Sequence, residues 1–407
     1  MRRPVPRRSS RPTPRRSGRS PRATVIVASD WAPIRAFDRI VRDDPESVYG
    51  DLLPILRGAD LRVVNCECAL TRSTRAVWKS GAVFKGEPAH VKGLTVVPFD
   101  VACLANNHVL DYGVPGLSET LRLLRRHGIR TVGAGLTEQE AYSPLSVAVK
   151  GVQLHIVNFS EGEDLTAARG GPGVFGWDIP RVVEEVRRRK KGGGVVIAIG
   201  HCGLEYVPYP PPYVVGAFRA IAEAGADCVI GHHPHVPQGM EWRDGCPIFY
   251  SLGNFVFYQP AALHYRKIGF LVTLRLERDG IAGVTLHPYR ITDAAVRALG
   301  PAEDRAFRRD LARISRPFST PAGPSRAWDA YLAYYGFEGF TAEVNGIIER
   351  MKTEPQKAAA MFRNRVTTMQ HAELWRDALT RIVSGGAPRP PRQAAETVVE
   401  WFTRPAD

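Results

Sequence analysis

Polar residues able to bind metal ions gather at five places in this 407-residue chain, each directly after an apolar run. They are Ser29-Asp30, Asn65-Cys66-Glu67, Asn106-Asn107-His108, His201, and the run Gly231-His232-His233-Pro234-His235. Carboxylate and amide oxygens and imidazole nitrogens are ligands that suit divalent Mn, Fe, Zn or Mg. A carboxylate can bridge two metal ions while each imidazole fixes one. The set therefore predicts a centre in which two metal ions activate a water molecule and bind an oxyanion.

The histidine run at 232–235 is the most specific of these clusters. Three histidines in four positions, beside a proline and after a buried strand, are not explained by packing. A lone aspartate at a strand end, such as Asp30, more often caps a loop than binds a metal ion. The metal interpretation therefore rests on the joint pattern rather than on any one residue.

The six cysteines are sparse for this length and form no Cys-x-x-Cys pair, so we expect reduced, buried side chains. Two of them, Cys66 and Cys68, flank Glu67. Neighbouring residues of an extended strand point to opposite faces of the sheet. If Glu67 faces the metal centre, both thiols therefore face away from it, and thiolate ligation is disfavoured.

Strand and helix patterns alternate from Thr24 onward, and these elements must position the polar clusters. Strand patterns occur at residues 24–29, 61–67, 96–104, 129–135, 194–201 and 226–230, and helical patterns at 50–58, 113–128, 180–193 and 214–225. Residues 145–160 form a predicted hairpin with Lys150-Gly151 at its turn, and residues 247–291 are rich in strands. This alternation predicts a layered α/β or α+β domain over residues 23–295. In such folds the loops after buried strands carry the chemistry.

Composition changes on both sides of this domain. Residues 1–22 hold nine arginines and no acidic residue, which predicts a disordered tail that is either an electrostatic tether or a solvated start. Residues 296–386 have helical spacing with arginine-rich surface positions. Residues 387–407 have the composition of a linker-like tail.

The net charge of +14 is concentrated in the first 22 residues, so the other 385 residues carry only +5. The folded part gives no case for a nucleic-acid-binding domain, and nucleic acid is disfavoured as a partner. No stretch approaches the roughly 18 apolar residues that a membrane span needs. The apolar run ATVIVA is too short for the core of a signal peptide, and we predict a cytoplasmic location.

Four motifs together resemble the bacterial capsule synthesis family of CapA-like proteins, which are linked to poly-γ-glutamate capsule synthesis. They are LANNHVLDYGVPGLSETLRLLRRHGIRTVGAG, HCGLEY, GADCVIGHHPHVPQGMEW and PIFYSLGNFVF, in this order within about residues 24–290. That family resembles a branch of the calcineurin-like metallophosphoesterases. The resemblance implies a four-layered α/β/β/α sandwich with a two-metal site and, in this chain, a helical C-terminal region beside it.

The resemblance also implies a role for each residue that matches the motifs. The implied metal ligands are Asp30, Glu67 as the bridging carboxylate, Asn107, His201, His233 and His235. His108 is implied to contact the substrate or to protonate the leaving group. Glu205 is implied to act beside the metal ions or on the substrate. Asp111 either orients His108 or forms the turn before Gly113.

The chain departs from the wider superfamily at its first strand end. Phosphoesterases often begin with Asp-x-His, but here Asp30 is followed by Trp31 and Ala32, so the first metal ion lacks a usual imidazole. Glu67 is longer than an aspartate, which changes the expected spacing of the metal ions.

Together with the metal-binding pattern, the resemblance to the CapA-like family implies a hydrolase or transferase that uses about two Mn, Zn or Fe ions on a phosphoester, an acyl phosphate or a γ-glutamyl amide. Its partner would be an anionic small molecule or polymer, with Lys85 either binding that anion or lying in solvent. The alternative is a non-catalytic accessory or scaffold protein that uses the fold as a binding platform in a biosynthetic complex.

Overall fold

Two β-sheets packed face to face form the centre of the protein, whose computed structural model describes residues 22–385 and 389–406. The first sheet has the order β17-β16-β15-β1-β2-β5-β6 and consists of β1 (Ala23–Trp31), β2 (Leu61–Cys66), β5 (Val101–Cys103), β6 (Arg130–Val132), β15 (Ile268–Glu277), β16 (Gly280–Ile291) and β17 (Val296–Ala298). The second sheet has the order β13-β14-β12-β11-β9-β8 and consists of β8 (Leu145–Val149), β9 (Val152–Ser160), β11 (Val195–His201), β12 (Cys228–His232), β13 (Met240–Arg243) and β14 (Cys246–Phe249). Two short ribbons pair β3 (Ala69–Leu70) with β4 (Lys85–Gly86) and β7 (Ala134–Gly135) with β10 (Gly173–Val174).

The central strands of each sheet are parallel. In the first sheet β1, β2, β5 and β6 run in one direction, and in the second sheet β9, β11, β12 and β14 do so. Antiparallel strands such as β15, β8 and β13 flank them. The carboxyl ends of the parallel strands in a sheet lie at one edge, so the polar residues that follow these strands gather there.

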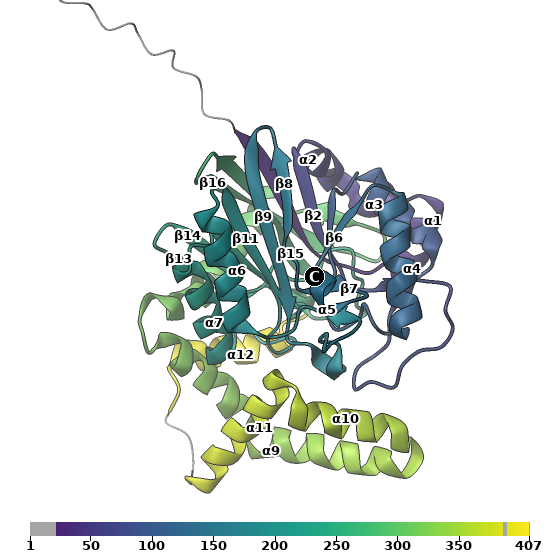
Figure 1. Cartoon of the computed structure of the whole chain (residues 1–407). Helices are drawn as coiled ribbons and strands as arrows, with labels where there is room; N and C mark the ends of the chain where they lie inside the picture. The colour runs from purple at the N-terminus through teal and green to yellow at the C-terminus, as the bar shows by residue number, and fades with distance from the viewer. Residues whose placement is uncertain (1–21, 386–388, 407) are drawn as a thin grey trace, which may run out of the picture.

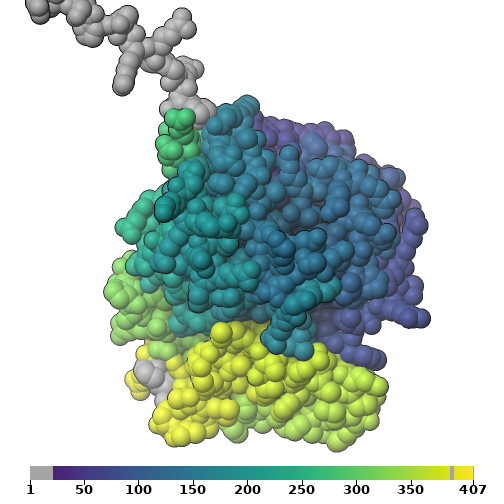
Figure 2. Space-filling view, viewed as in Figure 1, coloured from purple at the N-terminus to yellow at the C-terminus, as the bar shows by residue number. Residues whose placement is uncertain are grey.

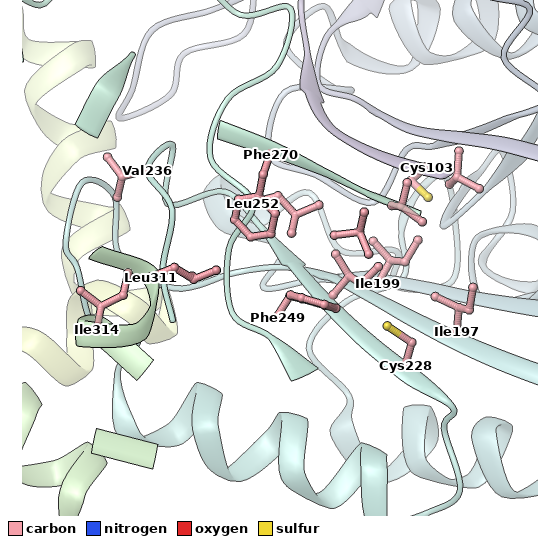
Figure 3. Close-up of a cluster of buried hydrophobic side chains, with 14 of the residues drawn as sticks. Cys103, Ile197, Ile199, Cys228, Val236, Phe249, Leu252, Phe270, Leu311 and Ile314 are labelled. Atoms are coloured by element: carbon pink, nitrogen blue, oxygen red, sulfur yellow. The ribbon is translucent and has the colours of Figure 1, made fainter. Parts of the chain in front are cut away.

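Side-chain alternation divides the interior into layers. Val25 and Val27 of β1 pack between the sheets against a cluster that includes Ile197 and Ile199 of β11. Ile26, between the two valines, points to the opposite face and packs with helices. Figure 3 shows part of the core between the sheets. This period of two is the pattern of strands buried on both faces.

Helices cover both outer faces, and the predicted four-layered sandwich is confirmed (Figure 1). The first sheet is covered by α1 (Ala36–Asp43), η1 (Ser47–Leu52), α2 (Leu53–Arg57), α3 (Val91–Val96) and α4 (Gly113–Arg126). The second sheet is covered by α6 (Ile179–Lys191) and α7 (Pro212–Glu223). Shorter elements in the connections are η2 (Pro88–His90), α5 (Glu138–Ala141), η3 (Glu163–Leu165) and η4 (His264–Arg266).

The chain after the sheets is helical and covers one end of the sandwich, as Figure 2 shows in yellow and light green. It consists of α8 (Pro301–Ser315), η5 (Arg316–Ser319), α9 (Gly323–Thr353), α10 (Pro355–Thr367), α11 (Met369–Val383) and α12 (Arg392–Thr403). Helix α9 bends at Gly336, whose φ is 52°. None of the described helices is long and apolar enough to cross a bilayer.

Local sequence patterns predicted most elements but failed in two places. The strand predicted at 96–104 is only β5, three residues long, because Val96 ends α3 and residues 97–100 form the turn between the helix and the strand. An apolar run of this length does not distinguish a strand from a buried helix.

The predicted hairpin is confirmed, because Lys150 and Gly151 both have positive φ and close the turn between β8 and β9.

The linker-like tail predicted at 387–407 is wrong for most of its length, because residues 392–403 form α12. Its buried residues Ala394, Thr397, Val398 and Trp401 lie three and four apart, the spacing of one helical face. The Pro-rich residues just before this helix masked that spacing. The predicted tail at 1–22 lies outside the described residues except for Arg22.

Helix α12 is attached to the sandwich by an aromatic stack. The Trp401 ring is 3% exposed and lies parallel to Tyr265 with 3.4 Å between the ring centroids. Glu400 accepts a hydrogen bond from the Tyr265 hydroxyl at 2.7 Å. These contacts show that the end of the described chain is part of the folded structure.

We expect Trp401→Ala to lower the free energy of unfolding by about 3–5 kcal/mol, because it removes a large buried ring. Val399→Ala is the matched control, since Val399 is on the same helix but 47% exposed, and its effect should stay within about 0.5 kcal/mol. Urea unfolding followed by circular dichroism measures both. Equal stability of the two variants would contradict the packing of α12.

Candidate metal centre

The carboxyl ends of strands from both sheets meet at one buried site. Asp30 lies at the end of β1, Glu67 directly after β2, and His201 ends β11. His233 and His235 follow β12, and a loop after β5 supplies Asn107. All six predicted metal ligands are buried and brought together.

Three ligand atoms converge on the Nε2 atom of His201. This nitrogen lies 3.2 Å from Glu67 Oε1, 3.0 Å from Asn107 Oδ1 and 3.1 Å from His233 Nδ1. Atoms with lone pairs do not attract one another at such distances unless a proton or a cation lies between them. The group Glu67, His201 and His233 could therefore hold a metal ion.

A second group shares Glu67 with the first. Asp30 Oδ2 lies 3.6 Å from His235 Nδ1, and Glu67 Oε1 lies 3.9 Å from His235 Nε2. Asp30, Glu67 and His235 could hold a metal ion between them. Glu67 thus occupies the position between two candidate sites, as expected for a bridging carboxylate.

The buried carboxylates of this site lack hydrogen-bond donors for some of their oxygens. Asp30 Oδ2 and both oxygens of Glu67 are buried and receive no hydrogen bond from the described residues. Leaving a charged group in this state costs several kcal/mol, and native proteins pair such groups or use them on metal ions. The residues present therefore fit divalent cations.

Burial and charge set the protonation of the ligands. Burial lowers the pKa of His201 and of His233 to about 3, so both imidazoles are neutral and have a free lone pair. Burial, together with the charge of Asp30, raises the pKa of Glu67 to about 8. Burial opposes charge on His235 too, but Glu67 and Asp30 outweigh it and raise the pKa of His235 to about 10. Without a cation, the site therefore retains protons at neutral pH.

The backbone is strained where it presents the histidines. His233 has a φ of 98° and His235 a φ of 57°, in a region that side chains other than glycine rarely adopt. Such residues cost about 1–3 kcal/mol each and cluster at functional sites. Gly231, just before them, allows close approach of Tyr250, whose carbonyl oxygen would lie 2.0 Å from an added Cβ.

His108 and Asp111 form a hydrogen-bonded pair beside the candidate ligands. Asp111 Oδ2 lies 2.7 Å from His108 Nδ1. This is the contact expected if Asp111 orients the His108 ring. Lys79, which is buried, donates to Asp111 Oδ1 at 2.8 Å and to the Asn107 carbonyl at 2.7 Å. Burial lowers the pKa of Lys79, but the nearby carboxylates, Asp111 first, outweigh this effect and raise it.

A cleft of about 460 Å³ opens onto this centre. It is lined by Asn107, His108, Glu163, Glu205 and His235, by the cations Arg35, Lys79 and Arg266, and by aromatic residues that include Phe84, Tyr206 and Phe257. Glu205 is partly exposed, and its Oε1 lies 4.0 Å from His235 Nε2. Lys85 is not among the described residues that line the cleft and instead pairs with Glu87 at 3.1 Å.

Several residues of the site had no role predicted from the sequence. Asn65 donates to Asp30 Oδ1 at 2.8 Å, and the Asn254 amide oxygen lies 2.8 Å from His235 Nδ1. Asn65 belongs to the polar cluster at the end of β2, and Asn254 belongs to the motif PIFYSLGNFVF, so both lay within patterns that were a usable signal. Lys79 and Glu163 lie in loops without periodicity, where the sequence gives no such signal.

The cysteines have the state that the sequence predicted. All six are free and buried, and Cys66 and Cys68 pack into the apolar cluster under the helices of the first sheet.

Asn106 shapes the loop after β5, because its side-chain oxygen accepts hydrogen bonds from the backbone N–H groups of His108 and Val109.

Comparison with known proteins shows the family of the chain. The model of the family described as "Bacterial capsule synthesis protein PGA_cap" matches residues 24–259. The chain belongs to this family. The resemblance noted in the sequence is therefore confirmed.

Curated relatives carry related names. The PGA biosynthesis protein CapA of Bacillus subtilis (strain 168) is 32% identical over 253 residues, which cover 61% of this chain and 66% of that protein. The capsule biosynthesis protein CapA of Bacillus anthracis is 30% identical, with 53% of each chain covered. A probable polyglutamine synthesis accessory protein of Mycobacterium tuberculosis is 28% identical, with 66% of this chain and 77% of that protein covered. The chain thus spans between half and two thirds of the two Bacillus relatives.

Among solved structures, the 5′-nucleotidase precursor from Thermus thermophilus is similar over 73% of this chain and 59% of its own, with a TM-score of 0.43 and 13% identity. The sulfate thiohydrolase SoxB of Thermus thermophilus has a TM-score of 0.38 and 18% identity, with 68% of this chain and 46% of that chain covered.

The raised pKa of Glu67 predicts that metal affinity depends on pH. Coordination requires the carboxylate, so binding must displace a proton at any pH below about 8. The Kd for Mn²⁺ should therefore fall by at least about tenfold from pH 6 to pH 7. Isothermal titration in buffers of different ionisation enthalpy measures both the Kd and the protons released.

Glu67→Gln is the control for that titration, because the amide has no proton to release. Its weaker binding should change less with pH than binding by the wild type. A wild-type Kd that is constant between pH 6 and pH 8 would contradict a protonated Glu67 in the metal-free site.

Proposed function

We propose that the chain is a metal-dependent hydrolase or transferase that acts on a phosphoester, an acyl phosphate or a γ-glutamyl amide in the synthesis of poly-γ-glutamate or a related polymer. The observation that carries the proposal is the pair of buried carboxylates, Asp30 and Glu67, whose free oxygens face histidine nitrogens. Membership of a capsule synthesis family supports the polymer context.

The ligand atoms divide between two ions. Asp30, Glu67 and His235 would hold one ion. Asn107, His201 and His233 would hold the other ion together with Glu67. Mixed oxygen and imidazole ligands suit Mn, Zn or Fe. Such ions supply a water molecule activated at neutral pH and a positive charge that stabilises an oxyanion.

The pair His108–Asp111 is placed to handle a proton. Asp111 accepts from His108 Nδ1, which fixes the ring and leaves Nε2 for a proton exchanged with the substrate. Phe84 packs against this ring, with 4.4 Å between the ring centroids, and excludes water from one side of it. His108 therefore suits the role of acid toward the leaving group.

The cations of the cleft favour an anionic substrate. Arg266 lies 3.8 Å above the Tyr206 ring, and Arg35 lies 5.5 Å from the Phe84 ring centroid, so aromatic rings orient both guanidinium groups. A guanidinium group binds carboxylate or phosphate through two parallel hydrogen bonds. The cleft thus suits a substrate with negative charge close to the scissile bond.

A second candidate function is an accessory role without turnover. The Mycobacterium tuberculosis relative is named an accessory protein. In that case the centre would bind metal ions and an anionic chain without breaking a bond.

Metal content tests the proposal first. We expect about two Mn, Zn or Fe ions per purified chain by elemental analysis, and fewer in Glu67→Gln and His233→Ala, because both remove a ligand. His127→Ala is the matched control, since His127 is exposed at the end of α4. A wild-type chain that holds no metal above background, even after incubation with Mn²⁺ or Zn²⁺, would end the hydrolase proposal.

Turnover tests the role of His108. In a screen of phosphoesters, acyl phosphates and γ-glutamyl amides, His108→Asn should lower kcat by about 10²–10⁴-fold without loss of metal. Asp111→Asn should lower kcat in the same direction by misorienting the ring. A metal-loaded wild type without activity on any of these substrates would favour the accessory role.

A further inference from the structure

The side-chain amide of Asn107 must point in one particular direction to serve the metal centre. Its Oδ1 lies 3.0 Å from His201 Nε2, among the atoms that converge there, and its Nδ2 points away toward Glu163. An amide turned by 180° would present N–H groups to the ion and lose the ligand oxygen. Something other than the metal ion must therefore fix the amide before an ion binds.

Glu163 is the group that fixes it. Its Oε2 accepts a hydrogen bond from Asn107 Nδ2 at 2.9 Å. A carboxylate only accepts hydrogen bonds, so the reversed amide would place oxygen against oxygen.

The C-terminal helices hold Glu163 in turn. Asn364 of α10 is 1% exposed and donates to Glu163 Oε1 at 3.0 Å, and His371 Nε2 of α11 lies 3.5 Å from the same oxygen. Asn364 also donates to Ser80 at 2.6 Å, in the loop that carries Lys79. Both helices lie outside residues 24–259, which the family model matches.

The loop that presents Glu163 is strained. Asp164 has a φ of 55° and Leu165 a φ of 67°, both in the left-handed region, although neither is glycine. Leu165 is also 53% exposed, so its own packing does not explain the conformation. Strain of this kind persists only where surrounding contacts impose it. Here those contacts are the hydrogen bonds to Glu163 and the two that Asp164 accepts from Ser80.

We infer that Glu163 is a positioning residue that orients the Asn107 amide toward the metal ion, and that α10 and α11 complete the centre by holding Glu163 through Asn364 and His371. This inference rests on the proposed function, because it presupposes an ion at the Asn107 oxygen. It assigns the helical C-terminal region an indirect part in metal binding, through Glu163 and Asn107.

The test is a double-mutant cycle on Mn²⁺ affinity, measured by isothermal titration of the metal-free full-length chain. Glu163→Ala should weaken binding by about 10–100-fold, the usual effect of losing a residue that orients a ligand. In an Asn107→Ala background the same change should have no further effect, because Glu163 acts through Asn107. Asn364→Ala should weaken binding in the same direction by less.

Two further variants separate positioning from loss of structure. Glu163→Gln keeps the size of the side chain but tolerates either orientation of the Asn107 amide, so its affinity should lie between those of wild type and Glu163→Ala. Asp377→Ala removes the carboxylate that accepts a hydrogen bond from the Trp328 N–H between α9 and α11, and this variant should bind Mn²⁺ as wild type does.

The outcomes are distinguishable. Wild-type affinity in Glu163→Ala, or an equal loss with and without Asn107, would overturn this inference and leave the metal centre intact. A wild-type chain that does not bind Mn²⁺ would instead overturn the proposed function. An Asp377→Ala affinity as low as that of Asn364→Ala would show that the helices act through general stability and would also overturn the inference.

Discussion

The burial of two carboxylates with too few hydrogen-bond donors is the constraint on which the rest of this structure depends. Asp30 and Glu67 lie at the ends of neighbouring strands, both fully buried, and three of their four oxygens receive no hydrogen bond from the described residues. Negative charges in a medium of low dielectric constant repel strongly and lose their hydration. The shifted pKa values of Glu67 and His235 are the response of a cation-free site to this charge.

The two-sheet topology is what forces these groups together. Parallel strands in each sheet deliver their polar ends to one edge, and the packing of two sheets brings ligands of both to the same place. β1 and β2 supply the carboxylates, whereas β11 and the loop after β12 supply the imidazoles. Neither sheet alone contains a complete set of ligands, so the apolar core between the sheets also determines the geometry of the site.

The sequence predicted the parts of the site that depend on local pattern. Ligands that directly follow a buried strand, such as Glu67, His201 and His233, are recognisable because the apolar run fixes where the strand ends. Glu163 and Asn364 are not recognisable in this way, because their importance comes from a contact between residues 201 positions apart. Lys79 was also missed, because it lies in an irregular loop and only the fold shows that its side chain is buried. Helix α12 was missed because proline-rich composition outweighed its helical spacing.

Asn107 and His108 are adjacent in sequence but have different proposed roles, and their side chains are held by different residues. The Asn107 side chain is fixed by Glu163, whereas the His108 ring is fixed by Asp111. Lys79 joins the two, since it donates both to the Asn107 carbonyl and to Asp111. Its loop is in turn bound by α10, where Lys357 donates to the Lys79 carbonyl at 3.0 Å. Helix α10 therefore contacts the supports of both neighbours, Glu163 through Asn364 and the Lys79 loop through Lys357. A displacement of this helix would loosen the candidate metal ligand and the candidate acid together. These contacts connect the C-terminal helices to the centre, although the helices contribute none of its candidate ligands.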